Sequence, residues 1–304
     1  MSSLTELLAA RGGPPLFDGA MGTLLQQRGL ADGGSGELWN VDQPDIIAQI
    51  HREYSAAGAT FLTTNTFGGT RPRLAMHGLA DRVGELNQAA ARIARQAAHD
   101  HDALVVGDLG PTGELLEPMG TMSAAEAEAH FEEQLRGLAA GGVDVILIET
   151  MSDLGELEVA IRAAASVTPE LPVVATLSFD TNLHTMMGVS PELAVKTLAD
   201  FGVAAVGANC GRGPSEMEAI MASMVTARPA GLLLIAQSNA GLPQLVGDHF
   251  EYDAPVPEMA AHAVRLRDMG VDLIGACCGS TPEHVAAMRV ALQGASSDER
   301  RVDE

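Results

Sequence analysis

Residues 143–149 read Val-Asp-Val-Ile-Leu-Ile-Glu, and residues 154–165 read Leu-Gly-Glu-Leu-Glu-Val-Ala-Ile-Arg-Ala-Ala-Ala. The first segment is apolar almost throughout rather than alternating, which is typical of a strand that is buried on both faces. The second segment is rich in Ala, Leu and Glu, which favour a helix. Together the two segments predict one strand followed by one helix.

The same pair recurs along the whole chain. Apolar runs occupy residues 15–20, 60–64, 103–108, 143–149, 172–179, 203–209, 231–237 and 271–277. Helical segments occupy residues 45–57, 81–98, 124–140, 154–165, 191–201, 215–227, 257–269 and 282–292. Eight strand–helix units predict an α/β protein with a single (β/α)8 TIM barrel over residues 1–293. We expect the polar tail, residues 294–304, to fray. A doubly wound open sheet is the alternative, although it usually has fewer strands.

Charge and composition narrow the function classes. The chain has 18 Lys and Arg against 40 Asp and Glu, a net charge of -22, which disfavours nucleic acid and anionic membranes as partners. No apolar run approaches the roughly 18 residues of a membrane span, and the N-terminus lacks the pattern of a signal peptide. We therefore expect a cytoplasmic protein. Its three cysteines, two of them adjacent, do not form a disulfide framework, which leaves metal binding or catalysis.

All three cysteines fall where predicted strands end, which is where barrel enzymes carry their active sites. They are Cys210, Cys277 and Cys278, each within a glycine-flanked segment. A cysteine is often only a small buried apolar residue. Three thiols at one rim instead match a catalytic zinc site with three protein ligands and one open position. Adjacent ligands require the chain to leave strand geometry at Cys278, and Gly279 supplies that freedom.

The chemistry of such a site points to sulfur. A zinc ion with three thiolate ligands carries a net negative charge. A substrate thiol that entered the fourth position would lose its proton to the metal and stay electron-rich. This suits a nucleophilic thiolate better than a metal-bound hydroxide. The site alone therefore predicts alkylation of a thiol.

Six segments, spread over most of the chain, carry a family resemblance. They are Phe-Asp-Gly-Ala-Met-Gly-Thr at 17–23, Thr-Asn-Thr-Phe at 64–67, Gly-Pro-Thr-Gly at 110–113, Ile-Glu-Thr at 148–150, Gly-Ala-Asn-Cys at 207–210 and Gly-Ala-Cys-Cys-Gly at 275–279. In this order they resemble the homocysteine S-methyltransferase family. That family includes betaine–homocysteine methyltransferase and the homocysteine domain of cobalamin-dependent methionine synthase.

The resemblance implies roles for individual residues. It implies a zinc-bearing barrel that makes methionine, with Cys210, Cys277 and Cys278 as ligands to Zn2+. It also implies that Asp18, next to Gly19, and Glu149 hold the amino group of homocysteine.

Each carboxylate has a plainer alternative. Asp18 could be a turn residue, and Glu149 could be a carboxylate at a helix start. Asp108 either lines the pocket or caps a helix or turn.

Two further polar residues follow predicted strands. Asn239 resembles a residue that lies near the metal when substrate is absent, or it is a turn former before Ala240. His184 is expected to be a solvated loop residue.

The methyl donor is the open question. Residues 37–40 and 67–74 resemble bacterial betaine-type members, and Trp39 could stack on a quaternary ammonium. Alternatively, Trp39 anchors its loop to the barrel. Aromatic residues are only 3% of the chain, and Gly68 and Thr150 stand where animal betaine-using enzymes have tyrosines. Residues 237–243 instead resemble methionine synthase.

We favour a small onium donor such as glycine betaine. The first alternative is methylcobalamin on a separate corrinoid protein, because no segment of the sequence matches the Asp-x-His-x-x-Gly pattern of a corrinoid domain. S-methylmethionine is a third possible donor. A zinc-binding regulatory barrel without turnover is the alternative that is not an enzyme.

Overall fold

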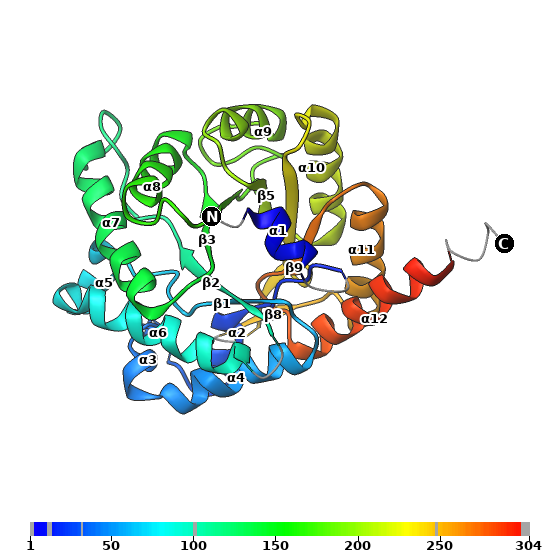
Figure 1. Ribbon diagram of the computed structural model, residues 1–304, viewed down its shortest axis with the longest axis horizontal. Helices are drawn as coiled ribbons and strands as arrows, with labels where there is room; N and C mark the ends of the chain where they lie inside the picture. The colour runs from blue at the N-terminus through cyan, green and yellow to red at the C-terminus, as the bar shows by residue number, and fades with distance from the viewer. Residues whose placement is uncertain (1–2, 11–13, 32, 100–101, 247–248, 299–304) are drawn as a thin grey trace.

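The computed structural model describes residues 3–10, 14–31, 33–99, 102–246 and 249–298. Seven parallel strands form one curled sheet in the order β1-β2-β3-β4-β5-β6-β9 (Figure 1). They are β1 (Phe61–Thr63), β2 (Leu104–Leu109), β3 (Val145–Met151), β4 (Val173–Leu177), β5 (Ala205–Cys210), β6 (Leu233–Ser238) and β9 (Leu273–Ala276). Each coincides with one of the predicted apolar runs.

The first predicted run closes the sheet into a barrel. Leu16 forms a parallel bridge with Ile274 of β9, and Phe17 forms one with Phe61 of β1. The backbone N–H of Phe17 donates to the carbonyl of Ile274 at 2.8 Å. This run pairs at only two residues, because the chain turns after Asp18 into the next helix. The single (β/α)8 TIM barrel is thus confirmed.

The eight predicted helices are all present, and each begins within two residues of its expected start. They are α4 (Pro44–Ala56), α6 (Val83–Ala98), α7 (Ala124–Gly141), α8 (Leu154–Val167), α9 (Pro191–Asp200), α10 (Pro214–Ala227), α11 (Val256–Asp268) and α12 (Pro282–Asp298). The expected tail therefore begins within the last turns of α12, and residues 299–304 lie outside the described residues. In the described part of the chain, no helix is both long and apolar enough to cross a membrane.

Several short elements were not predicted. They are α1 (Leu4–Ala9), α2 (Met21–Gln27), α3 (Trp39–Asp42), α5 (Arg71–Ala75), the 3-10 helix η1 (Ala80–Arg82) and an antiparallel hairpin of β7 (Pro243–Val246) and β8 (His249–Tyr252). Most of them are helices of one or two turns, which are too short to show a periodic apolar pattern in the sequence. The hairpin leaves the barrel between β6 and α11.

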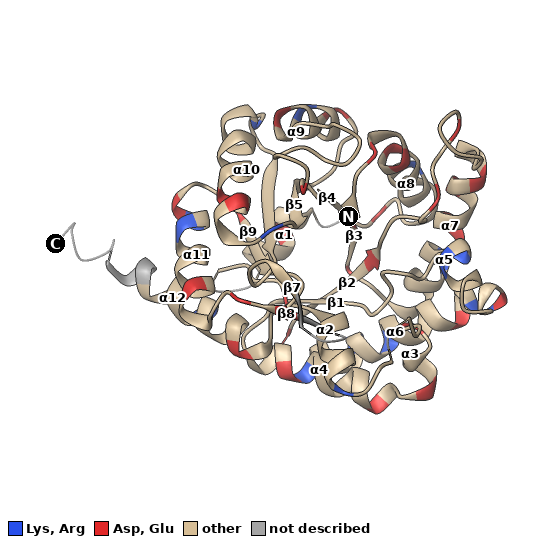
Figure 2. Ribbon diagram, turned by 180° about the vertical axis from the view of Figure 1, so that it is seen from behind, with Lys and Arg blue, Asp and Glu red and all other residues tan. Residues whose placement is uncertain are grey.

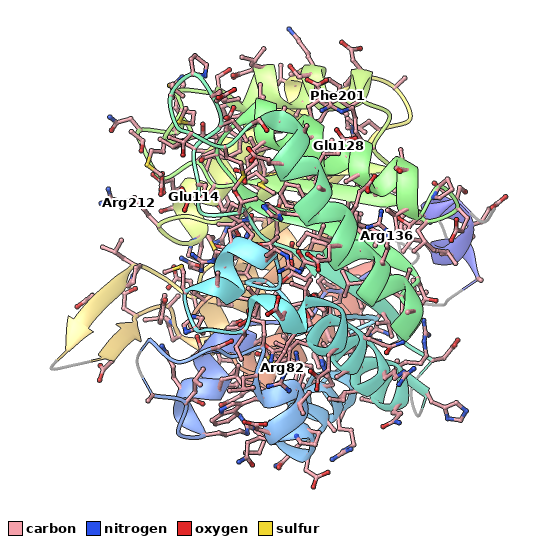
Figure 3. All side chains as sticks on the ribbon, turned by 90° about the vertical axis from the view of Figure 1, so that its left-hand side faces the viewer. Arg82, Glu114, Glu128, Arg136, Phe201 and Arg212 are labelled. Carbon is pink, nitrogen blue, oxygen red and sulfur yellow. The ribbon has the colours of Figure 1, made fainter. Side chains whose placement is uncertain are left out.

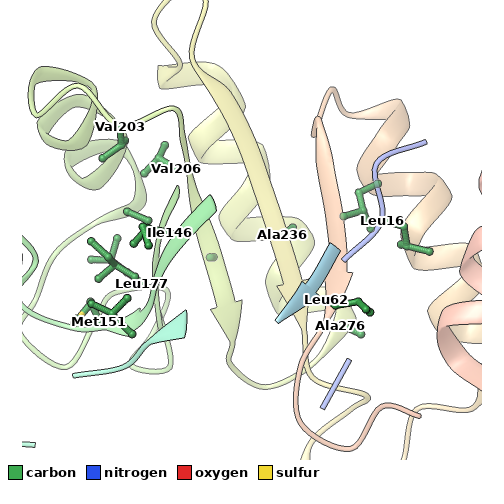
Figure 4. Close-up of a cluster of buried hydrophobic side chains, with 14 of the residues drawn as sticks. Leu16, Leu62, Ile146, Met151, Leu177, Val203, Val206, Ala236 and Ala276 are labelled. Carbon is green, nitrogen blue, oxygen red and sulfur yellow. The ribbon is translucent and has the colours of Figure 1, made fainter. Parts of the chain in front are cut away.

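The core has two layers because neighbouring strand residues point to opposite faces. Inside the barrel, Phe17 stacks on Phe61 with ring centroids 4.2 Å apart, and Val145 and Leu147 belong to the same cluster. The outer layer lies between the strands and the helices, and Figure 4 shows part of it. It includes Leu16, Leu62, Ile146, Met151, Leu177, Val206, Ala236 and Ala276. This alternation explains why the strand sequences are continuously apolar.

The two ends of the barrel are built differently. Helix α1 lies over the end where the strands begin, and its Leu4 joins the inner cluster. The β7–β8 hairpin lies at the opposite end, on the same side as Glu114 and Arg212 (Figure 3). Figure 2, the view from that side, also shows acidic residues on several outer helices, in line with the net charge of -22. The end with the hairpin is where the strands finish, and it is free for a site.

Candidate metal and substrate site

Three cysteine sulfurs meet at the carboxyl end of the barrel. Cys210 is the last residue of β5, while Cys277 and Cys278 follow directly after β9. The Sγ atom of Cys277 lies 3.0 Å from that of Cys210 and 3.9 Å from that of Cys278. All three sulfurs lie within 4.8 Å of one another. The structure thus brings together the three thiols that the sequence singled out.

Adjacent cysteines reach one point because the chain leaves strand geometry after β9. The N–H of Cys277 donates to the carbonyl of Ser238 at 2.8 Å, and the carbonyl of Cys278 accepts from the N–H of Ala240 at 2.9 Å. Gly279 follows with a φ of +79°, a conformation that glycine adopts without steric cost. The turn expected at this position is therefore present.

Cys210 is held from the other side by Asn209. The Oδ1 atom of Asn209 accepts from the Thr150 N–H at 2.9 Å and from the Thr176 hydroxyl at 2.8 Å. Its Nδ2 atom donates to Thr150 Oγ1 at 2.6 Å and to Cys210 Sγ at 3.6 Å. Cys210 itself has a φ of +61°, which a residue with a side chain rarely adopts. These bonds hold β3, β4 and β5 together around that unusual backbone.

A pocket of about 360 Å³ opens beside the sulfurs. Its walls include all three cysteines and the predicted residues Asp18, Gly19 and Glu149, together with Asp108. Gly19 is required by close packing, because a Cβ atom there would overlap Ser280 Oγ and touch the Tyr54 ring. One cavity therefore holds thiols on one side and carboxyl groups on the other.

Asp18 is buried and rigidly oriented. Its Oδ2 accepts from the Thr63 N–H and its Oδ1 from the Thr63 hydroxyl, both at 2.7 Å. Burial raises the pKa of Asp18 to about 7, although the two bonds from Thr63 counteract part of the rise. Asp18 is thus more than a turn residue: its carboxyl is fixed at the pocket wall.

Glu149 and Asp108 bring two more carboxyl groups to the same pocket. Glu149 lies inside β3, and Asp153 caps the following helix, so Glu149 is not a helix-start residue. Burial raises the pKa of Glu149 to about 8, with further contributions from Cys278 and Asp18.

Asp108 is the least satisfied of these carboxyl groups. Burial, with the nearby charges of Glu149 and Asp18, raises the pKa of Asp108 well above its usual range. Its buried Oδ1 has no hydrogen-bond partner among the described residues. Buried carboxyl groups without a basic partner favour binding of a cationic group.

The stability of the ligand-free protein is expected to fall as pH rises from about 4 to about 7. The folded state raises the pKa of Asp18 from 3.8 to about 7, so it binds this proton more tightly than the unfolded state. That stabilisation is complete below the unfolded pKa and is lost as pH rises through the folded pKa. It amounts to at most about 4 kcal/mol at 1.4 kcal/mol per pKa unit.

Urea unfolding at several pH values, with wild-type protein and Asp18→Asn, measures this effect. The variant should show a shallower fall. Some pH dependence should remain, because Asp108 and Glu149 shift in the same direction. Equal slopes for the two proteins would contradict the assignment.

Asn239 lies beside the cysteine cluster. Its Nδ2 donates to the carbonyl of Gly211 at 2.7 Å, and its N–H lies 3.4 Å from the carbonyl of Cys210. Its Oδ1 is buried and has no partner among the described residues. The side chain therefore has one acceptor atom without a partner, although Asn239 is not among the described residues that line the pocket.

Trp39 and His184 lie away from the pocket. Trp39 begins α3, packs partly buried against the main core and is absent from the described residues that line the pocket. This position matches the reading of Trp39 as a loop anchor. His184 is exposed between β4 and α9, with Nδ1 3.0 Å from the carbonyl of Asn182, as expected for a loop residue.

The positions of two residues beside the sulfurs were not predicted from the sequence. In the sequence, Asn209 stands out only as part of the Gly-Ala-Asn-Cys segment, and Tyr252 belongs to no recognised segment. Tyr252 ends the β7–β8 hairpin, and its side chain packs against Gly279, the residue after Cys278. Hydrogen bonds from Cys210 and Cys277, with a smaller contribution from Tyr252, lower the pKa of Cys278 to about 3. The one sequence feature that could have drawn attention to Tyr252 is that tyrosine is rare in this chain, which has 2.

Comparison with known proteins agrees with this geometry. The family model for homocysteine S-methyltransferase matches residues 15–292. Methionine synthase from Mycobacterium tuberculosis is 34% identical over 303 residues, which cover 94% of this chain. Methionine synthase from Mycobacterium leprae is 33% identical over 309 residues, which cover 96% of this chain. The chain spans 25% of the length of each of these two relatives.

Solved structures share the fold. The homocysteine methyltransferase MmuM from Escherichia coli, in its metallated form, superposes with a TM-score of 0.78 at 23% identity. The match covers 93% of this chain and 98% of MmuM. The family match extends over most of the barrel that carries the thiol cluster. The chain belongs to the homocysteine S-methyltransferase family.

Proposed function

We propose that the chain is a zinc-dependent homocysteine S-methyltransferase that makes methionine. The observation that carries this proposal is the convergence of three cysteine sulfurs within 4.8 Å of one another. They share a single pocket with the carboxyl groups of Asp18 and Glu149. A thiol substrate that also carries an ammonium group fits both halves of that pocket.

The donor set suits zinc. Zinc prefers sulfur ligands at about 2.3 Å in a tetrahedron, which places pairs of sulfurs about 3.8 Å apart. The Cys277–Cys278 separation of 3.9 Å already meets this value. The Cys210–Cys277 separation of 3.0 Å would widen around an ion. Cys210, Cys277 and Cys278 would hold the ion, and a fourth ligand could be the substrate sulfur or, in the absence of substrate, Asn239 Oδ1.

The carboxyl groups orient the substrate. In the proposal Asp18 and Glu149 accept hydrogen bonds from the ammonium of homocysteine, which turns its thiol toward the cysteines. Asp18 is preoriented by Thr63, so little conformational freedom is lost on binding. The ammonium in turn compensates charges that are costly to bury alone.

The reaction is a methyl transfer to sulfur. Zinc, when bound, keeps the substrate thiol deprotonated at neutral pH. The residues of the pocket hold that sulfur in line with the methyl group and limit the access of water. The new carbon–sulfur bond forms as the bond between the methyl group and its donor breaks, and the electron pair leaves with the donor.

A small onium donor such as glycine betaine is supported by charge. Glu37 and Asp108 line the pocket in addition to the two carboxyl groups assigned to homocysteine. Phe67 is the one Phe, Tyr or Trp among the described lining residues, so a cation would be held mainly by carboxylates rather than by an aromatic cage. S-methylmethionine also carries a positively charged onium group, so the same argument applies to it.

A second candidate donor is methylcobalamin carried by a separate corrinoid protein. Exposed large apolar side chains occur in the loops that follow three strands at the open end of the barrel. They are Leu115, Met119, Leu183, Met186 and Leu242. Such a rim supports docking of a second protein over the pocket, as does the likeness to methionine synthases.

A methionine assay by mass spectrometry separates these donors. Zinc-loaded protein receives homocysteine together with betaine, S-methylmethionine or methylcobalamin, each in a separate reaction. We expect methionine from an onium donor. Methionine only from methylcobalamin would establish the second candidate. No methionine from any donor, with zinc bound, would contradict the proposed activity and favour a regulatory barrel.

A further inference from the structure

We propose that Arg73 binds a carboxylate of the methyl donor and thereby selects donors that carry both an onium group and a carboxylate. The inference rests on the proposed function, because it concerns the second substrate of the same pocket. Glycine betaine and S-methylmethionine belong to this class of donor. Methylcobalamin and simple tetraalkylammonium ions do not.

Arg73 stands out because its guanidinium has no partner. The residue belongs to α5 (Arg71–Ala75), lies half-buried and lines the pocket. Its side chain forms no hydrogen bond and no ion pair with any described residue. Every other half-buried arginine of the described chain donates to a carboxylate or carbonyl oxygen; these are Arg28, Arg71, Arg82, Arg95, Arg228, Arg267 and Arg289. Since a guanidinium offers five donors, an unpaired one at a pocket wall indicates an anionic ligand.

The helix that carries Arg73 is anchored by a different arginine. Arg71 Nη2 donates to Glu133 Oε1 at 2.7 Å, and its Nη1 lies 3.2 Å from Asp81 Oδ1. These ion pairs fix α5 to α7 and to η1. Arg73 is therefore not needed to hold the helix, and its charge is available to the pocket.

A glycine leaves room for the Arg73 side chain. Arg73 Cδ and Nη1 lie 3.2 and 3.5 Å from the place that a Cβ atom on Gly113 would take. Three residues earlier, a Cβ atom on Gly110 would lie 2.6 Å from Cε2 of Phe67, which also lines the pocket. The segment after β2 thus supports Phe67 and Arg73 side by side at one wall of the pocket.

This wall lies across the barrel from the cysteine sulfurs. Cys210 ends β5 and Cys277 follows β9, and β6 lies between these two strands in the sheet. In the barrel that residues 16–17 close, β6 stands opposite β2, the strand that precedes Gly113. A substrate sulfur held at the cysteines therefore has the Arg73 wall on its far side, where a methyl donor has access to it.

The charges at this wall match a zwitterion. Asp108 and Glu37 bring carboxyl groups to the pocket, and Arg73 is the one Lys or Arg among the described lining residues. An onium group fits against Asp108 and the ring of Phe67, and a carboxylate fits the planar fork of the guanidinium. A donor with positive charge alone would be repelled by Arg73. Arg73 therefore favours a donor of both charges.

The carboxylate of homocysteine is the competing ligand for Arg73. In the proposed function, the ammonium of homocysteine is held by Asp18, which is only 3% exposed, and by Glu149. Arg73 is half-buried, and His77, which also lines the pocket one turn further along the chain, is exposed. Arg73 thus belongs to the outer part of the pocket, which the deeper acceptor leaves to the donor.

Donor binding, measured by calorimetry, tests the inference. Zinc-loaded protein is saturated with homoserine, which has a hydroxyl group in place of the thiol of homocysteine. The probes are glycine betaine and tetramethylammonium, which is betaine without its carboxylate; S-methylmethionine and trimethylsulfonium form a second pair. Arg73→Gln should weaken binding of the carboxylate-bearing probes roughly 20-fold and should not weaken binding of the simple cations. Arg73→Lys, which keeps the charge, should recover part of the loss.

Arg212→Gln is the matched control. Arg212 lies at the same end of the barrel (Figure 3), is exposed and does not line the pocket. Its guanidinium, like that of Arg73, bonds to no described residue. The control removes the same charge from the rim and should leave all four affinities unchanged. Homocysteine affinity should be the same in Arg73→Gln, Arg212→Gln and the wild type.

Three outcomes for Arg73→Gln would overturn the inference: unchanged affinity for the carboxylate-bearing probes, equal weakening of both members of each pair, or weakening of homocysteine instead. Methionine formation by the wild type is measured on the same preparations. If betaine or S-methylmethionine yields methionine while the variant keeps its affinity, only the inference fails. Methionine from methylcobalamin alone would overturn the inference and leave the methyltransferase standing, whereas no methionine from any donor would remove the proposed function as well.

Discussion

Replacing Cys277 by serine is expected to abolish zinc binding and to lower methionine formation roughly a thousandfold, or about 4 kcal/mol in the transition state. Cys277 is the central sulfur of the cluster, in contact with both Cys210 and Cys278. A serine hydroxyl is a poor substitute for a thiolate ligand to zinc. The barrel should remain folded, because the backbone bond from residue 277 to Ser238 does not involve the side chain.

Metal analysis, far-ultraviolet circular dichroism and the methionine assay together check this result. The matched control is wild-type protein stripped of zinc by a chelator, which should be equally inactive. Added zinc should restore activity to the stripped wild type and not to Cys277→Ser. A variant that retained one zinc per chain and normal turnover would remove Cys277 from the proposed site.

Glu149→Gln should weaken homocysteine binding by roughly 30-fold, or about 2 kcal/mol, because it removes a charged acceptor for the ammonium. The amide has nearly the same shape as the carboxyl group, so the pocket should keep its form. Affinity for 4-mercaptobutanoate, which is homocysteine without its amino group, should change little. Calorimetry on zinc-loaded protein measures both constants.

Glu114→Gln provides the comparison. Glu114 is an exposed carboxylate at the same end of the barrel (Figure 3), and it does not line the pocket. Removal of its charge should leave both affinities unchanged. If Glu149→Gln weakened the two thiols equally, Glu149 would act on the sulfur end of the site instead of on the amino group.

The fold could be predicted almost completely because its signal is repeated. Each strand is buried on both faces, so that its sequence is apolar almost throughout, and α7, α8 and α9 begin with side chains that cap the helix. Ser123 and Glu126, for example, form the reciprocal capping bonds that their spacing predicts. The first predicted run departs most from the expectation, because it forms only two bridges, at Leu16 and Phe17, instead of a full strand.

The site could be predicted only where residue type restricts chemistry. Three thiols at strand ends are compatible with few functions, whereas a single aromatic residue is compatible with many. Trp39 attracted attention as the only Trp of the chain, yet it packs against the core. The contact of Tyr252 with Gly279 depends on the position of the β7–β8 hairpin. Tertiary packing sets that position, and the local sequence does not encode it.

The single bridge between Leu16 and Ile274, the seam at which the barrel closes, has a consequence for the order of assembly. Its partners lie at opposite ends of the chain, and such distant contacts form late, both in refolding and during synthesis. Asp18 follows one side of the seam, and Cys277 follows the other. A chain made only as far as the end of β6 therefore contains Cys210 and the carboxyl groups but neither of the last two thiols. Tight capture of a metal ion at the proposed site would then mark a finished barrel, and incomplete chains would compete poorly for zinc.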